Sequence, residues 1–67
     1  MQIQFQFKTN GSAVEGCPAR YQVTSAEGGY IVQGKKVLDD ETRAQLRQLA
    51  ADEDAVWVPA DIIERTG

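Results

Sequence analysis

A chain of 67 residues that holds one cysteine, Cys17, and no histidine must keep its fold by packing alone. It cannot close an internal disulfide, and it cannot build a zinc site from several cysteine or histidine ligands. A domain of this size buries only about 60% of the surface that its unfolded chain exposes, so its stability as a monomer is small. We therefore expect a single domain over residues 1–67 and consider a homodimer, because small scaffolds often gain stability by associating.

The missing histidine also limits the chemistry that the chain can perform. A Ser/His/Asp triad and a Cys/His dyad are excluded, and no group of polar residues in the sequence suits proton transfer or nucleophilic attack. We expect a non-enzymatic protein with no catalytic residues, no metal site and no cofactor. The net charge of −3 and the pI near 4.7 disfavour direct nucleic-acid binding, which needs clustered cations.

Hydropathy gives no sign of a membrane or export segment. No apolar stretch approaches the ~20 residues of a membrane span. The first residues, Met1–Lys8, lack the basic and apolar regions of a signal peptide. We expect a cytoplasmic protein that does not enter a membrane.

Alternation of apolar and polar residues predicts the first strand. In Gln2–Lys8 the apolar side chains Ile3, Phe5 and Phe7 fall on one face, and the period of two indicates a strand with one buried face. Asn10-Gly11 follows, and this dipeptide is a strong hairpin signal. An uncovered face or edge of this strand could pair with a second copy of the chain.

The next segments predict two more strands in an antiparallel meander. The stretch Ser12–Ala19 is irregular, and its Gly16 and Pro18 suit a bulge, bend or edge. Alternation resumes in Arg20–Ser25, with Tyr21 and Val23 on one face. A turn is expected at the glycine pair of Ala26–Gly29. The apolar run Tyr30–Val32 follows, and Lys35–Val37 extends that strand past Gly34.

A helix and a fourth strand complete the expected order. Asp39 or Asp40 can cap a helix over Asp40–Ala51. The apolar stripe of this helix contains Leu46, Leu49 and Ala50. The acids Asp52–Asp54 oppose the helix dipole at its C-terminal end, so we expect the helix to end there. Ala55–Val58 predicts a short strand, and Pro59 suits the first position of a helical turn over Ala60–Arg65. The fold class is therefore α+β: an antiparallel sheet of three to four strands with one helix packed on it (β-β-β-α-β plus a short C-terminal helical turn).

Three apparent chemical motifs have simpler explanations. Cys17 has only Arg20 near it in sequence and no second cysteine, so a half-buried structural thiol is favoured over a reactive one. Gly29–Lys35 matches G-x-x-x-x-G-K, but Lys36 follows where a phosphate loop has Ser or Thr, and the residues between read as strand. Six acids bracket the predicted helix, whose ends would lie about 18 Å apart, so capping explains them better than a cation site.

Six residues are candidates for contact with a protein partner. Lys35, Lys36, Arg43 and Arg47 form a basic group in which the two arginines, four apart, would share a helix face. Asp40 could equally neutralise Arg43. Large aromatic side chains are frequent interface anchors, although a strand tryptophan in so small a protein is also a normal core residue. The partner-binding candidates are Tyr30, Lys35, Lys36, Arg43, Arg47 and Trp57.

Several residues together resemble a known group of proteins. They are Cys17-Pro18, Tyr21, Thr24, Gly29-Tyr30, Val32-Gln33-Gly34, Lys36-Val37, Val56, Val58-Pro59 and Ile62. In this order and spacing the chain resembles short uncharacterised actinobacterial (Streptomyces-type) proteins of the pattern CP…Y…G.Y.VQG.KV…VP. Lys35 stands where those proteins tend to carry Trp, which puts a shared partner in doubt. The resemblance implies no catalytic residues; it implies genes beside helix-turn-helix regulators.

Two hypotheses for function follow. The first is a small interaction or regulatory accessory protein that binds a protein partner, such as a helix-turn-helix transcriptional regulator, with its acidic charge complementing a basic DNA-binding protein. The second is a dimeric β-ribbon DNA-binding transcriptional regulator, which the net charge of −3 disfavours.

Overall fold

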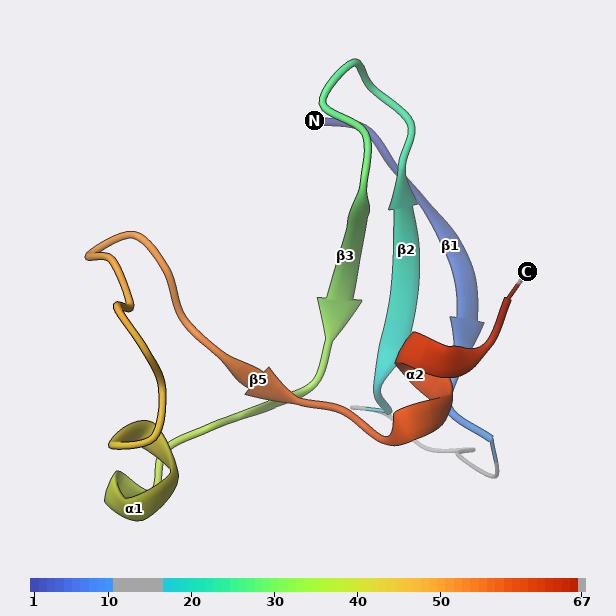
Figure 1. The fold of residues 1–67 in the computed structure, drawn as a ribbon. Helices are drawn as coiled ribbons and strands as arrows, with labels where there is room; N and C mark the ends of the chain where they lie inside the picture. The colour runs from blue at the N-terminus through green and yellow to red at the C-terminus, as the bar shows by residue number, and fades with distance from the viewer. Residues whose placement is uncertain (11–16, 67) are drawn as a thin grey trace.

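The structure is a computed structural model that describes residues 1–10 and 17–66. These residues form a three-stranded sheet, a two-stranded sheet and two short helices (Figure 1). The expected small α+β fold is confirmed. The Gly11 half of the predicted Asn-Gly turn and the predicted bulge at Gly16 lie outside the described residues.

The main sheet is an antiparallel meander in the order β1-β2-β3, as expected. Its strands are β1 (Ile3–Lys8), β2 (Ala19–Val23) and β3 (Tyr30–Gln33). The glycine turn between β2 and β3 is also confirmed. Gly28 and Gly29 have φ of 69° and 87°, a left-handed geometry that glycine adopts without strain.

A β-bulge in β1 overturns the predicted alternation. Phe5 pairs with Tyr21, but Phe7 pairs with Arg20, so Gln6 is an extra residue on the β1 side. Directly paired residues share a face of the sheet; Phe7 therefore lies on the face opposite Phe5. Ring contacts agree, because Phe5 meets Tyr21 edge-on at 5.7 Å while the Arg20 guanidinium lies 4.6 Å from the Phe7 centroid.

Helix α2 (Ala60–Glu64) covers the Phe7 side of the sheet (Figure 1). Arg20 Nη1 donates to the Ile62 carbonyl at 3.1 Å, and the Arg65 guanidinium lies 4.1 Å from the Phe7 ring centroid. The predicted C-terminal helical turn is confirmed, with Pro59 at the N-cap, one position before the expected one. Ile62 is fully buried beneath the helix, so α2 is the helix that packs on the sheet.

Residues 35–57, here called the arm, leave the main sheet after β3 and return before α2 (Figure 1). The arm contains β4 (Lys35–Lys36), α1 (Asp40–Arg43) and β5 (Val56–Trp57), and β4 and β5 pair with each other as a separate antiparallel ribbon. The strand expected past Gly34 and the fourth strand both exist, but neither joins the main sheet.

The long helix predicted over Asp40–Ala51 is wrong. Helix α1 ends at Arg43 and buries none of its residues. Farther along, Gln48 adopts φ of 50°, which no right-handed helix can include. The apolar stripe lies on the arm, apart from the main sheet (Figure 1), and a helix shorter than about 12–15 residues is marginal without packing.

The buried core of the described residues is small. Its apolar members are Cys17, Ala19, Val23 and Ile62, exposed by 4%, 1%, 5% and 0%. Cys17 is more buried than the half-buried thiol expected. The expectation that the Ile3 and Phe5 face would be buried is wrong, because both side chains are half exposed.

Candidate partner-binding site

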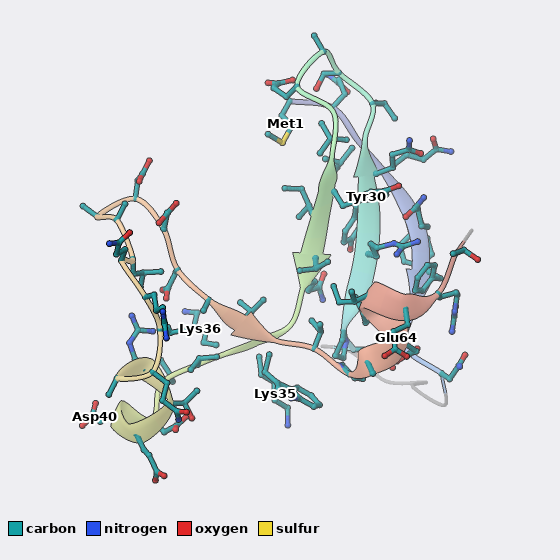
Figure 2. All side chains as sticks on the ribbon, viewed as in Figure 1. Met1, Tyr30, Lys35, Lys36, Asp40 and Glu64 are labelled. Atoms are coloured by element: carbon teal, nitrogen blue, oxygen red, sulfur yellow. The ribbon has the colours of Figure 1, made fainter. Side chains whose placement is uncertain are left out.

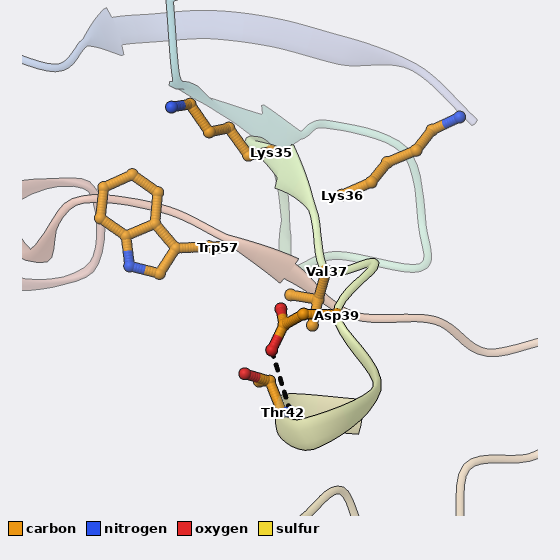
Figure 3. A pocket seen from close by; sticks show the side chains of 6 residues that line it. All are labelled: Lys35, Lys36, Val37, Asp39, Thr42 and Trp57. Carbon is orange, nitrogen blue, oxygen red and sulfur yellow. Dashed lines mark hydrogen bonds between the residues drawn. The ribbon is translucent and has the colours of Figure 1, made fainter. Parts of the chain in front are cut away.

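An open hollow of about 360 Å³ lies at the base of the arm (Figure 3). It is formed by the end of the β4–β5 ribbon and the start of α1. Its lining residues are Lys35, Lys36, Val37, Asp39, Thr42 and Trp57. Three of the six predicted partner-binding residues therefore come together in one place, although Trp57 is 21 or more residues from either lysine in the chain.

The register of the ribbon places the aromatic ring beside one lysine. Lys35 pairs with Trp57 and Lys36 pairs with Val56, and paired side chains share a face of a ribbon. Figure 3 shows the same arrangement: the Lys35 and Trp57 side chains extend to one side, whereas Lys36 extends to the other. The hollow thus offers an indole surface with the Lys35 side chain on the same face of the ribbon.

Gly34 is required for the chain to enter the arm. A Cβ atom at this position would collide with the Trp57 carbonyl and would lie 2.6 Å from Val58 Cγ1. The backbone between β3 and β4 therefore passes too close to the chain around Trp57 for any side chain. This close approach joins the arm to the rest of the molecule at a defined point.

The acidic wall of the hollow is the N-cap of α1. Asp39 Oδ2 accepts a hydrogen bond from the Thr42 amide at 3.0 Å, drawn as a dashed line in Figure 3. The hydrogen bonds from Thr42 lower the pKa of Asp39 below its ordinary value. Of the two predicted caps, Asp39 is the one used, and its carboxylate stays ionised at neutral pH.

Trp57 is a surface residue, with 54% of its area exposed. The sequence favoured a core role for this tryptophan over a contact role, and the exposure shows that the core role is wrong. A half-exposed indole in a hollow is the type of residue that anchors protein interfaces. Leu38, 74% exposed on the same arm, adds further apolar surface.

Arg43 fastens the arm instead of facing a partner. Its Nη1 donates to the Val37 carbonyl at 2.8 Å and to Asp54 Oδ1 at 3.0 Å. The pKa of Asp54 is lowered, first by the hydrogen bond from the Ala55 amide and then by Arg43. The predicted neutralisation of Arg43 by Asp40 is wrong: the ion pair of Arg43 is with Asp54, which follows the end of the predicted helix.

The two remaining candidates lie elsewhere. Arg47 is exposed beyond the end of α1, so the premise that it shares a helix face with Arg43 is wrong. Tyr30 lies on β3 of the main sheet (Figure 2), where the Arg20 guanidinium is 5.1 Å from its ring centroid. Its ring is 60% exposed. Neither residue lines the hollow.

Val37, Asp39 and Thr42 were missed as members of the site. The sequence indicated a strand at Val37 and a cap at Asp39, but it held no signal that these residues would meet Trp57. Such a signal would have to report the pairing of β4 with β5, which lie about 20 residues apart in the chain. Local patterns do not carry that information.

Charge is unevenly distributed along the arm. Residues 38–55 contain six of the ten acidic residues and two of the seven basic ones, so this part of the arm carries −4. Lys35 and Lys36 reduce the net charge of the whole arm, residues 35–57, to −2, and the body carries −1. The negative charge is therefore concentrated in residues 38–55 and not in the whole arm.

The described residues hold neither a metal-binding cluster nor a membrane-spanning helix. In the described ranges, 1–10 and 17–66, no three His, Cys, Asp or Glu side chains lie in a group that could hold a metal ion. Within the same ranges, neither helix has the length and apolar character required to cross a bilayer.

Comparison with known proteins returned nothing further. No protein-family model, curated protein or solved structure matches this chain.

Proposed function

We propose that the chain is a non-enzymatic interaction protein whose arm binds a protein partner, namely a DNA-binding transcriptional regulator of the helix-turn-helix kind. The observation that carries the proposal is the position of Trp57. Its indole is 54% exposed in an open hollow, on a segment outside the main sheet. Contact of the apolar Trp57 ring with water is unfavourable, and the ring adds nothing to the core. Binding of a partner, which buries the ring, is the function that such a surface serves best.

Charge supports a basic partner. The net −4 of residues 38–55 produces a negative potential around the arm, and complementary potentials accelerate encounter and select partners. The DNA-binding surface of a regulator is basic because it must neutralise phosphates. In this arrangement the acidic arm attracts the partner, and Trp57 provides the apolar anchor. The lysines at the base of the arm contribute their aliphatic stems to the hollow.

The resemblance to short actinobacterial proteins encoded beside helix-turn-helix regulators supports the same partner class. That resemblance includes Gly34, Lys36, Val56 and Val58-Pro59, which build or flank the ribbon. Lys35 replaces the tryptophan that is usual there.

Affinity capture tests the proposal. The tagged chain, its Trp57→Ala variant and its Ile63→Ala variant are each used to capture proteins from a lysate of the source organism. Ile63 is the matched control, because it is 64% exposed but lies on α2, away from the hollow. We expect the unmodified chain and Ile63→Ala to enrich the same DNA-binding protein, and Trp57→Ala to lose it.

The dependence of binding on salt concentration provides a second test. Attraction between the acidic arm and a basic partner weakens as ionic strength rises, so the association rate should fall in high salt. The proposal is wrong if no DNA-binding protein is captured. It is also wrong if Trp57→Ala captures the same protein as well as the unmodified chain does.

One observation favours the alternative of direct DNA binding. The β4–β5 pair is a two-stranded ribbon that carries Lys35 and Lys36, and such ribbons read DNA in some dimeric regulators. Fluorescence anisotropy with mixed-sequence duplex DNA at low salt, where phosphate binding is strongest, distinguishes the two functions. Binding that Lys35→Gln and Lys36→Gln both abolish would favour the alternative, and absence of binding would reject it.

A further inference from the structure

One face of the main sheet is apolar and only partly covered: Val23 on this face is buried, but three of its other side chains remain exposed. By register, Ile3, Phe5 and Ile31 lie on the same face as Tyr21 and Val23. Ile3 is 50% exposed, Phe5 52% and Ile31 39%. Helix α2 lies on the opposite face, where Arg20 meets the Ile62 carbonyl. These five residues, which span all three strands, are here called the open face.

We infer that the open face is covered by the open face of a second copy of this chain, which makes the protein a homodimer of two stacked sheets. The proposal concerns a surface other than the arm, and it stands whether or not the arm binds a regulator.

The area of the open face fits a dimer. An aromatic side chain presents about 150–250 Å², so the exposed part of Phe5 alone is on the order of 100 Å². With Ile3, Ile31 and part of Tyr21, the apolar area is on the order of 300 Å², which reaches the size of patch that often has a function. One side of a standard interface buries about 800 Å², of which roughly 450–520 Å² is apolar. The open face supplies the larger part of that requirement.

The chemistry of the open face selects a second copy over a charged partner. None of its five side chains is charged, so it provides no electrostatic basis for choosing a particular protein. At one end, Lys8 and Gln33 lie on the same face by register, and Tyr21 donates to Gln33 Oε1 at 3.0 Å. This is a polar rim beside an apolar centre, the usual anatomy of an interface. Two copies of an apolar sheet face can pack against each other about a two-fold axis, at about 10 Å and with a small rotation.

Long-range charge does not oppose the association. Each copy carries −3 in total, of which the arm, residues 35–57, holds −2 and the body holds only −1. The bodies of two copies can therefore approach without strong repulsion. Four buried apolar side chains form the core of the described residues, and a second copy would add the open face to it. A chain this short, without a disulfide, needs such additional buried apolar surface to be stable.

Molar mass by light scattering across a wide range of protein concentration tests the inference. We expect a mass of twice the chain's 7.4 kDa at high concentration. Phe5→Glu and Ile31→Glu should each raise the dimer dissociation constant about tenfold or more, because each buries a carboxylate at the interface. The matched control is Ile63→Glu, which changes an exposed isoleucine on α2 and should leave the dimer intact.

A second measurement protects the test against misfolding of a variant. Isotope-filtered NOE spectroscopy on the unmodified protein, prepared as a mixture of labelled and unlabelled chains, should show contacts between the Phe5 ring of one copy and the open face of the other. A chain that stays monomeric up to millimolar concentration overturns the inference. A dimer that both glutamate variants leave unchanged, or one that shows intermolecular contacts at Trp57 and none at Phe5, overturns it as well.

Discussion

Replacing Ile62 with alanine is a sharp perturbation of the body of the protein. Ile62 is fully buried, whereas its neighbour Ile63 on the same helix is 64% exposed. The two positions therefore receive the same chemical change in opposite environments. The difference between the two variants isolates burial, because the change in helix propensity is shared.

The magnitude follows from the atoms removed. Ile62→Ala deletes three carbons, and at roughly 0.8 kcal/mol for each buried methylene the transfer contribution is about 2.4 kcal/mol. The cavity left behind raises the expected loss to about 2–5 kcal/mol. A domain of this length has a free energy of unfolding of roughly 3–10 kcal/mol, so the variant loses a large share of its stability. Ile63→Ala should change it by no more than about 0.5 kcal/mol.

Urea unfolding followed by far-ultraviolet circular dichroism measures both variants. All samples share one protein concentration, because dimerisation would make stability depend on it. The two variants should show unchanged slopes and a large difference in midpoint. Equal free energies of unfolding, or a loss below about 1 kcal/mol for Ile62→Ala, would refute the claim that α2 seals the sheet through this side chain.

Three other perturbations address the remaining parts of the fold. Arg20→Lys loses the hydrogen bond to Gln6 and the flat guanidinium against Phe7, and denaturant unfolding should show a loss of roughly 1–3 kcal/mol; an unchanged midpoint would contradict this. Gly34→Ala forces residue 34 away from the backbone at Trp57, so it should lower the free energy of unfolding by roughly 1–3 kcal/mol and shift the NMR signal of the indole. Gly28→Ala strains the backbone but meets no neighbouring atom, so it should leave the indole signal in place. The pKa of Asp61 is lowered because the Thr9 hydroxyl and the Asn10 amide donate to its carboxylate, so its contribution to stability is complete at neutral pH and is lost as the pH falls below about 4. Thermal melts of Asp61→Asn should show a smaller acid loss than those of the control Glu64→Gln, and equal pH profiles would be evidence against the contact.

Local patterns predicted much of the main sheet. The glycine pair at Gly28 and Gly29 marked the turn, and alternation around Tyr21 and Val23 marked both a strand and its faces. The Asp39 cap and the helical turn after Pro59 were also visible. Each of these features depends on residues within a few positions of one another, which is the range over which turn, cap and strand preferences act.

The wrong predictions share one physical cause: they depend on contacts between parts of the chain that are distant in sequence. The apolar stripe at Leu46 and Leu49 satisfies the helix period, but the arm gives it no surface to pack against, and Gln48 turns left-handed instead. The bulge at Gln6 leaves no mark in an alternating sequence, yet it moves Phe7 to the other face of the sheet. In the candidate site, the types of Lys35, Lys36 and Trp57 pointed to contact, but only the pairing of β4 with β5 places them together.

The central claim is that the arm binds a protein partner through the hollow at Trp57. This residue is the single tryptophan of the chain, so its fluorescence reports the hollow directly. Emission of the unmodified protein should shift to the blue as the captured regulator is titrated, because the half-exposed indole becomes buried in the complex, and Trp57→Phe should bind more weakly by a competition assay. An emission spectrum that stays unchanged at saturating regulator, with equal affinity for Trp57→Phe, would contradict the claim.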